Sequence, residues 1–363
     1  MATTLNEVCR LGQSIWLDSF DRAMLRSGHL KEMIEKQGLR GITSNPAIFE
    51  KAIAHSEDYT DDIHKLAESG EDNEHLFFDL AVDDIGRAAD LLLPVFRKDP
   101  SDGFVSLEVS PELARETDGT IRQAQRLWEQ LKRPNVMIKI PATKEGIPAI
   151  RECIRRGINI NVTLLFGLSR YEEVAHAYIE GMEARLKSGL SLQNIFSVAS
   201  FFLSRIDVLV DPMLEQKGMK EAKGQAAIAC ANAAYELYHM IFSSDQFSAL
   251  KEAGARPQRL LWASTSVKDP GYPKLKYVEA LIGRDTINTL PPDTLTALME
   301  QGRPVANLGR NNPVQLMHLE RLKQAGIDME SVSRQLEEEG IEKFNTAYRK
   351  LLEAIESVRE KVH

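Results

Sequence analysis

Short apolar runs alternate with amphipathic stretches along the whole chain. Eight of these runs have the length and the β-branched and aromatic content of strands, and each is bounded by helical or loop-like sequence. They lie at 14–19, 40–44, 104–109, 136–140, 160–165, 195–200, 259–265 and 285–290. Between them, apolar residues return at spacings of three and four, as on one face of a helix, most clearly in 113–133, 147–157 and 169–189.

Strands that alternate with helices predict a parallel sheet, because parallel neighbours need a crossover connection. Eight such units favour an α/β fold of the closed (β/α)8 TIM-barrel type over an open doubly wound sheet, and no GxGxxG follows the first strand. A barrel takes about 250 residues, whereas this chain has 363. We place the surplus in additional helices at 50–100, 207–258 and 328–361, and expect one domain over residues 1–363.

The alternation of side chains within the strands separates apolar from polar positions. In four strands one parity is wholly apolar and suits the helix layer, as with Ile160, Val162 and Leu164 in the fifth. The other parity then points several polar side chains into the barrel: Asp18, Glu108, Lys139, Asn161 and Thr163. Further polar residues lie at or just beyond strand ends: Asn45, Ser200 and Ser264. Because barrel enzymes collect their catalytic groups at the carboxyl ends of the strands, this pattern predicts a functional site.

Lys139 carries the strongest chemical signal of this group. A charged amine is costly inside a barrel unless it is paired or has lost its proton, and a neutral lysine can form a Schiff base with a ketone. Such chemistry also needs groups that accept and donate protons, and the two carboxylates Asp18 and Glu108 fit those tasks. Amides and hydroxyls would hold a polyol and a water: Asn45, Asn161 and Thr163.

Each of these residues also has a plain structural explanation. A lysine in an expected strand can lie at a sheet edge or in a misjudged helix. Asp18 can cap the next helix, Asn45 before a proline is a common helix start, and Thr163 suits any strand. The agreement of parity across several strands favours the functional explanation.

A phosphate site is predicted at the ends of the later strands. Ser200 and Arg205 could bind a phosphate through a hydroxyl and a guanidinium, although Arg205 could instead pair with Asp207 or with a neighbouring helix. The loops after the seventh and eighth strands of a barrel often bind phosphate. The loop after the seventh strand offers three further donors: Ser264, Ser266 and Lys268.

Net charge, apolar runs and the spacing of cysteines and histidines argue against several classes of function. The net charge of −8 argues against a general nucleic-acid binder, but not against a small anionic substrate. We find no secretory signal core and no apolar run of about 18 residues, so we expect a cytoplasmic protein without membrane insertion. The three cysteines lie far apart, and the histidines form no HExxH motif. We therefore expect neither a metal nor another cofactor.

Several segments from about residue 14 to residue 290 resemble the transaldolases, in their longer bacterial form. They read WLDSFDR, GITSNPAIF, VSLEVSPELA, VMIKIPATKEGI, GININVTLLF and SVASFFLSRIDV. The resemblance implies that Lys139 forms the Schiff base and that Asp18 is the base for the C4 hydroxyl of the donor. Glu108 would act through a bound water that Thr163 helps to position.

The resemblance also implies the binding residues. Asn45 and Asn161 would hold the dihydroxyacetone unit, Ser200 and Arg205 the phosphate, and Phe202 would form a wall of the pocket. Where shorter members of the family have ASFR, with a second phosphate-binding arginine, this chain reads ASTSVKD. Ser266 takes the place of the arginine, which leaves Lys268 to supply the charge.

The implied reaction belongs to the pentose phosphate pathway and needs no cofactor. Sedoheptulose 7-phosphate and glyceraldehyde 3-phosphate would exchange with erythrose 4-phosphate and fructose 6-phosphate. The expected partners are these sugar phosphates only, with the protein a monomer or a homodimer. One alternative is a fructose-6-phosphate aldolase, a lyase with the same fold. The resemblance implies that such lyases lack the carboxylate found here as Glu108, so Glu108 favours the transferase. The other is a non-catalytic sugar-phosphate-binding barrel.

Overall fold

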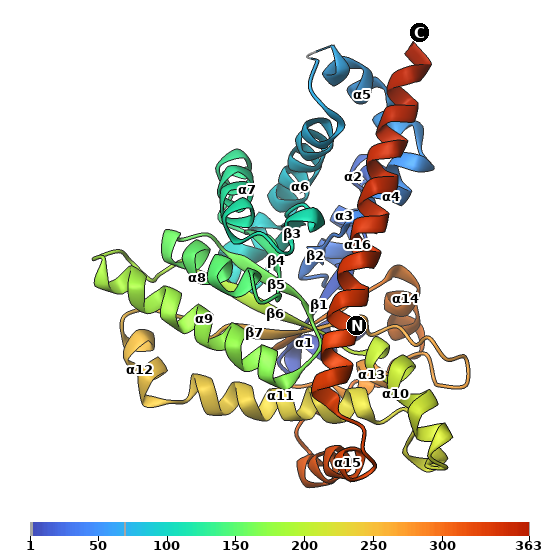
Figure 1. Ribbon diagram of the computed structural model, residues 1–363. Helices are drawn as coiled ribbons and strands as arrows, with labels where there is room; N and C mark the ends of the chain where they lie inside the picture. Colours follow the sequence, from blue (N-terminus) through green and yellow to red (C-terminus); the bar gives the residue numbers. More distant parts are fainter. Residues whose placement is uncertain (1–2, 69, 363) are drawn as a thin grey trace.

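The computed structural model describes residues 3–68 and 70–362, and eight parallel strands within these residues close into a barrel (Figure 1). Each strand pairs with the next one along the chain, and β8 pairs with β1. The strands are β1 (Gln13–Asp18), β2 (Gly41–Thr43), β3 (Phe104–Glu108), β4 (Val136–Pro141), β5 (Ile160–Leu165), β6 (Ser197–Phe202), β7 (Arg259–Ala263) and β8 (Thr286–Leu290). The predicted (β/α)8 barrel is confirmed.

Helices connect the strands and supply the rest of the described structure. They are α1 (Thr4–Arg10), α2 (Arg22–Arg26), α3 (His29–Glu32), α4 (Pro46–Ala54), α5 (Thr60–Ala67), α6 (Asn73–Lys98), α7 (Thr117–Leu131), α8 (Gly146–Arg156), α9 (Leu168–Lys187), α10 (Ser204–Gln216), α11 (Ala226–Phe242), α12 (Asp245–Glu252), α13 (Lys276–Ala280), α14 (Pro292–Gln301), α15 (Asn312–Gln324) and α16 (Met329–Arg359). Added helices occur in the three regions where the sequence predicted them, but two more were not predicted: α1, before the first strand, and α15.

All strand boundaries agree with the prediction to within two residues, but the shift of the sixth strand matters for the site. The sixth strand was expected at 195–200 but runs from Ser197 to Phe202, because it pairs in register with β7 up to Phe202 and Ala263. Ser200 therefore lies inside β6 and not at its end. Ser264 was expected near the end of the strand 259–265, and it lies just beyond the end of β7.

The apolar parity of the strands forms the layer between barrel and helices. Val136, Ile138 and Ile140 are completely buried, and β4 contacts α7 and α8. Leu164 departs from the predicted pattern, because the register between β5 and β6 shifts between Val162 and Leu165. Its backbone is left-handed, with φ of 53°. Its side chain consequently reaches α16, where a Cβ on Gly340 would lie 3.0 Å from it.

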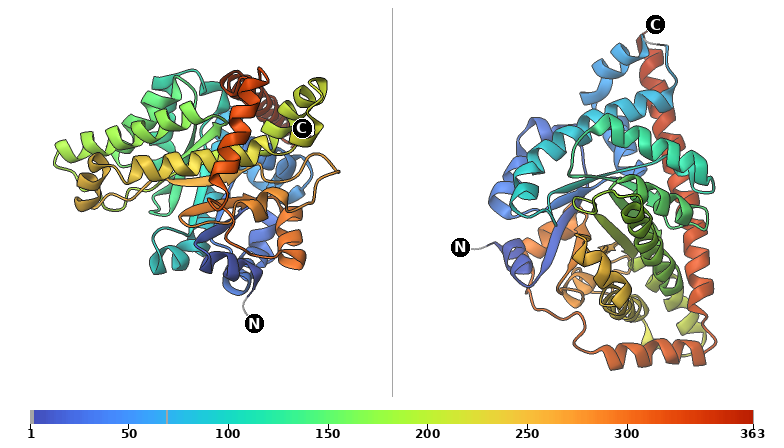
Figure 2. Two further views of the ribbon diagram at one scale, coloured as in Figure 1. Left: turned by 90° about the horizontal axis from the view of Figure 1, so that it is seen from below. Right: turned by 90° about the vertical axis from the view of Figure 1, so that its left-hand side faces the viewer.

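The long helix α16 crosses the molecule beside the barrel (Figures 1 and 2). It packs against α4, α5, α6, α10 and β5, elements that are far apart in the sequence. Its apolar stripe explains this packing, since Leu336, Phe344, Leu351 and Ile355 are buried while most of the polar residues between them are exposed or half-buried. The sequence predicted this helix, but it did not predict that the helix covers the barrel.

No helix in the ranges 3–68 and 70–362 combines the length and apolar character needed to cross a membrane. One continuous set of buried apolar side chains runs through the barrel and the added helices. This continuity supports the prediction of one domain over residues 1–363, which we keep as a proposal.

Ion pairs of the buried Arg22 side chain connect helices α2, α5 and α6. The Arg22 side chain at the start of α2 is 1% exposed, and its Nε donates to Asp84 Oδ1 in α6 over 3.0 Å. It also reaches Asp62 in α5 at 2.5 Å and lies over the Tyr59 ring, 4.3 Å from its centroid. Because Asp84 is completely buried, its charge depends on Arg22.

Replacing Arg22 by methionine is expected to lower the free energy of unfolding by about 3–5 kcal/mol, since Asp84 would keep its burial and lose its cation. The measurement is urea denaturation followed by circular dichroism. Arg26→Met is the matched control, because the Arg26 side chain is 53% exposed where it pairs with Asp58. That change is expected to cost no more than about 1 kcal/mol. Equal losses for the two variants would contradict the assignment of Arg22 as a buried anchor.

Candidate active site

Most of the predicted site residues line one cavity of about 260 Å³ at the carboxyl ends of the strands. They are Asp18, Asn45, Lys139, Thr163, Ser200, Phe202, Arg205, Ser264 and Lys268. Strands and their following loops provide all of them except Arg205, which lies at the start of α10, and this is the usual construction of a barrel site. Glu108 and Asn161 do not line this cavity, but both lie directly behind residues that do.

Lys139 is buried and paired. Its Nζ donates to Glu108 Oε2 over 3.0 Å and to the carbonyl oxygen of Ser44 over 2.9 Å. The pairing follows from the sheet, because Glu108 on β3 and Lys139 on β4 stand opposite each other in register. Lys139 is 4% exposed and Glu108 is 6% exposed. The surroundings of the amine are thus polar, and the carboxylate compensates the cost of its burial.

The two carboxyl groups near Lys139 both have a raised pKa. Burial raises the pKa of Asp18, and the charge of Lys139 together with a hydrogen bond from Thr43 opposes part of that rise. Burial also raises the pKa of Glu108, again against the attraction of Lys139. Both groups can therefore exchange protons nearer to neutral pH than exposed carboxyls do.

Two threonines that the sequence analysis missed complete this side of the site. Thr43 Oγ1 donates to Asp18 Oδ1 over 2.8 Å and lies 2.7 Å from Thr289 Oγ1. Both threonines line the cavity. Thr43 stands opposite Asp18 in the register of β1 and β2, which cannot be read from the sequence.

Asn161 links two serines by hydrogen bonds in the wall beneath the cavity. Its Nδ2 donates to Ser106 Oγ over 2.9 Å, and its Oδ1 accepts from Ser200 Oγ over 2.7 Å. Both ends of this buried amide are therefore occupied by protein. Asn161 fixes the direction of the Ser200 hydroxyl, while a direct contact with a ligand stays a prediction.

Asn45 and Thr163 retain free hydrogen-bonding atoms at the cavity. Asn45 Oδ1 caps α4 by accepting from the backbone N–H of Ile48 over 3.2 Å, as its plain explanation predicted. Its Nδ2 has no partner in the described part of the chain. The buried Thr163 Oγ1 likewise has no hydrogen-bond partner there. A buried hydroxyl without a partner is costly, so this position is suited to a water or a ligand.

The part of the cavity wall formed by α10 and the loop after β7, which we call the cationic end, carries Arg205 and Lys268. Arg205 lies in the first turn of α10, and its buried Nη1 has no hydrogen-bond partner among the described residues. The predicted alternative, a pair with Asp207, does not form. Asp207 instead accepts from Lys276 over 3.1 Å and from Tyr277 over 2.8 Å. Arg205 is left available for an anion.

The loop after β7 adds further donors next to Arg205. Ser264 has a left-handed backbone with φ of 53°, and its Oγ lies 2.9 Å from Ser204 Oγ. Lys268 Nζ donates to Ser266 Oγ over 2.7 Å. Partial desolvation and the nearby charge of Arg205 both lower the pKa of Lys268. Two cations that repel each other in this way favour a ligand with more than one negative charge.

Helix α16 brings two more residues to the cavity, Lys343 and Phe344. The centroid of the Phe344 ring lies 6.0 Å from Lys139 Nζ, and the side chain is almost fully buried. The sequence analysis missed both residues. No local pattern marks them, since their position depends on where α16 packs.

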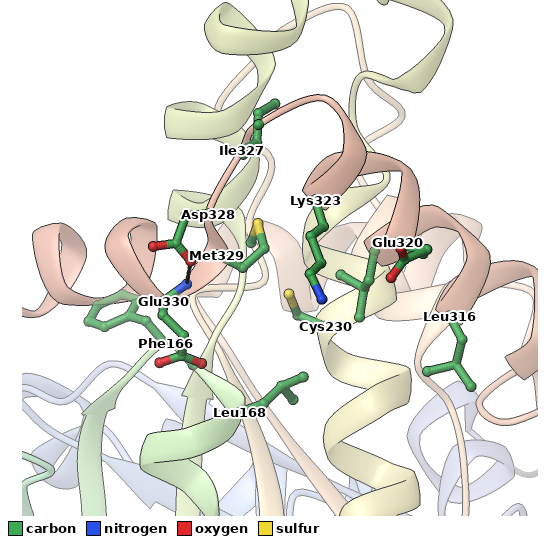
Figure 3. Close-up of a pocket in the computed structure, with 13 residues that line it drawn as sticks. Phe166, Leu168, Cys230, Leu316, Glu320, Lys323, Ile327, Asp328, Met329 and Glu330 are labelled. Atoms are coloured by element: carbon green, nitrogen blue, oxygen red, sulfur yellow. Dashed lines mark hydrogen bonds between the residues drawn. The ribbon is translucent and has the colours of Figure 1, made fainter.

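A larger cavity of about 600 Å³ lies elsewhere, between α9, α11, α15 and the start of α16 (Figure 3). Its walls are mostly carbon, including Leu168, Cys230 and Leu316. Phe166 separates the two cavities, since its ring packs on Phe202 with centroids 5.3 Å apart. None of the predicted site residues lines the larger cavity, so its size does not make it the active site.

The fold and the smaller cavity define the class of protein: a (β/α)8-barrel protein with a polar cavity that holds a lysine between two acids and has a cationic end. The family model described as "Transaldolase/Fructose-6-phosphate aldolase" matches residues 15–355. This chain belongs to that family, and the resemblance found in its motifs is confirmed.

Curated relatives narrow the comparison. A transaldolase of Thiobacillus denitrificans is 45% identical over 353 residues, covering 96% of this chain and 98% of that protein. A "Transaldolase 2" of Nostoc sp. is 44% identical, covering 97% and 96%. A transaldolase of Thermobifida fusca is 43% identical, covering 98% of each. Relatedness at this level over nearly the full length of both chains supports an enzyme of the transaldolase type, as the sequence predicted.

The raised pKa of Asp18 leads to a stability prediction. Folding raises this pKa, so the charged carboxylate opposes folding above the folded-state pKa, and the penalty disappears below the unfolded-state pKa. Asp18→Asn is therefore expected to increase the free energy of unfolding at neutral pH. The gain should shrink as the pH falls through the raised pKa toward the ordinary range of aspartate.

Urea denaturation at a series of pH values measures this difference. The matched control is Asp118→Asn at an exposed position of α7, which is expected to change stability by no more than about 0.5 kcal/mol. A loss of stability for Asp18→Asn at neutral pH would show that the attraction of Lys139 outweighs the burial of Asp18.

Proposed function

We propose that this protein transfers a dihydroxyacetone unit from a ketose phosphate to an aldose phosphate through a Schiff base on Lys139. The observation that carries the proposal is the position of Lys139, which is buried at the cavity with Glu108 on its Nζ. The family relationship supplies the substrates: sedoheptulose 7-phosphate and fructose 6-phosphate as donors, with glyceraldehyde 3-phosphate and erythrose 4-phosphate as acceptors.

Formation of the Schiff base begins with a proton transfer. Lys139 must lose a proton before its nitrogen can attack C2 of the ketose, and Glu108 is hydrogen bonded to it with a raised pKa. The attack gives a carbinolamine, which loses its hydroxyl as water. Glu108 returns the proton for that step through a water, and the free hydroxyl of Thr163 offers that water a hydrogen bond.

Cleavage of the carbon–carbon bond is the task of Asp18. Its carboxylate takes the proton from the C4 hydroxyl, the C3–C4 bond breaks, and the electron pair moves into the protonated imine. The aldose phosphate leaves and an enamine stays on Lys139. An incoming aldose phosphate reverses the same steps, and Asp18 returns the proton to the new hydroxyl. The raised pKa of Asp18 suits a group that both accepts and donates a proton.

The remaining residues bind the substrate. Asn45 offers its free amide N–H groups to the hydroxyls of the dihydroxyacetone unit, while Asn161 positions Ser200. Phe202 walls the cavity, and the phosphate lies at the cationic end. The residues proposed to bind the phosphate there are Ser200, Arg205, Ser264 and Lys268. A monomeric or homodimeric state and a cytoplasmic location stay predictions.

The proposed Schiff base predicts a covalent adduct. Incubation with fructose 6-phosphate and reduction with borohydride should add a dihydroxyacetone-derived group to Lys139, located by peptide mass spectrometry. Lys139→Met should give no adduct and lose the reaction, whereas Lys144→Met, at an exposed position, should keep both. An adduct on another lysine would reject this mechanism, and binding without any adduct would favour the non-catalytic barrel.

Dependence on an acceptor separates the transferase from the lyase. A transferase keeps the enamine until an aldose arrives, so fructose 6-phosphate alone should not turn over. Phe344 covers the amine that would carry this enamine. Phe344→Ala is therefore expected to raise acceptor-free release of dihydroxyacetone about tenfold, which corresponds to a barrier lowered by about 1.4 kcal/mol. Phe344→Leu is the control, because it keeps most of the apolar cover.

The two rates can be measured in one coupled assay with and without erythrose 4-phosphate. Rapid acceptor-free turnover by the wild-type protein would identify a lyase. An unchanged ratio of the two rates in Phe344→Ala would show that other groups exclude water from the enamine.

A further inference from the structure

One cation that lines the cavity, Lys343, belongs to none of the sequence motifs and has no role in the proposed reaction. Lys343 lies on α16 and lines the same cavity as Arg205 and Lys268. The other cations come from α10 and from the loop after β7, so three separate elements converge on the cationic end. A phosphate dianion carries two charges, and this chain lacks the second arginine that shorter relatives are expected to use.

Within residues 3–68 and 70–362, the Lys343 ammonium group makes one weak ionic contact. Its Nζ lies 3.7 Å from Glu339 Oε2, one helical turn earlier, with the two side chains 59% and 43% exposed. Ion pairs with this much exposure contribute little to stability. The contact therefore keeps Lys343 near the cavity without fixing it there.

Glu339 faces the same cationic group. Its Oε1 accepts from Gln335 Nε2 over 2.9 Å. Desolvation lowers the pKa of Arg205, and the charge of Glu339 opposes that change, so the carboxylate acts on Arg205 as well as on Lys343. In this structure Glu339 supplies negative charge to the place where we propose that a phosphate binds.

We propose that Lys343 is a third cation of the phosphate site and that Glu339 is its internal counterion, which the phosphate of the substrate displaces. The proposal rests on the proposed function for the position of the phosphate. Arg205 provides a planar, partly buried guanidinium, while Lys268 and Lys343 act as point charges at the rim. Helix α16 then binds the phosphate through Lys343 and covers the reacting amine through the next residue, Phe344.

The test compares three variants of the full chain. Lys343→Gln is expected to raise KM for fructose 6-phosphate about tenfold, with a much smaller change in kcat, because a charge-assisted contact is lost. Its affinity for inorganic phosphate, measured by calorimetry, should fall by a similar factor. Glu339→Gln should instead strengthen the binding of inorganic phosphate. Lys350→Gln, an exposed lysine on the same helix, is the matched control and should change neither value.

The calorimetric measurement does not depend on the reaction, so the two proposals can fail separately. Unchanged phosphate affinity and KM in Lys343→Gln would overturn the role of Lys343, even if an adduct forms on Lys139. Weakened phosphate binding without any adduct would keep the role of Lys343 and reject the Schiff base. Lys343→Arg should restore affinity, and failure to do so in a variant with wild-type thermal stability would also overturn the proposal.

Discussion

The hydrogen-bonded pair of Lys139 and Glu108 is the interaction on which the rest of the site depends. A barrel interior cannot accept an isolated ammonium group, and the register of β3 against β4 places a carboxylate directly beside it. Asp18 adds a second, half-buried acid near the same cation. Burial raises the pKa of both acids, and the charge of Lys139 offsets part of each rise. The proton chemistry is therefore a property of the group and not of one residue.

The site is built in two parts with different mechanical character. Strand residues form its floor, where hydrogen bonds such as those of Asn161 fix each side chain from behind. The loop after β7 and helix α16 form its roof, where contacts are more exposed and include the weak pair of Lys343 and Glu339. The side chains proposed for the proton transfers thus lie on strands, whereas two of the cations proposed for the phosphate, Lys268 and Lys343, lie on the more exposed part.

Sequence reasoning succeeded where local rules determine the structure. Parity within strands placed Asp18, Lys139 and Thr163 at the cavity, because alternate residues of a strand face opposite sides. The same rule misplaced Leu164, since a shift in register between neighbouring strands cannot be read from one strand alone. It also did not find Phe344, which reaches the site through the packing of a distant helix. The pairing of Glu108 with Lys139 needed the register between two strands, which only the structure provides.

The residues that close the site come from α16, which follows all eight strands along the chain. A ribosome makes the barrel strands first and the covering helix afterwards. A nascent chain can therefore assemble the floor, with its lysine and both acids, before any residue exists to shield it. Until α16 has been synthesised and has docked, Phe344 cannot cover the amine of Lys139, so the cover over the site is the last part of it to form.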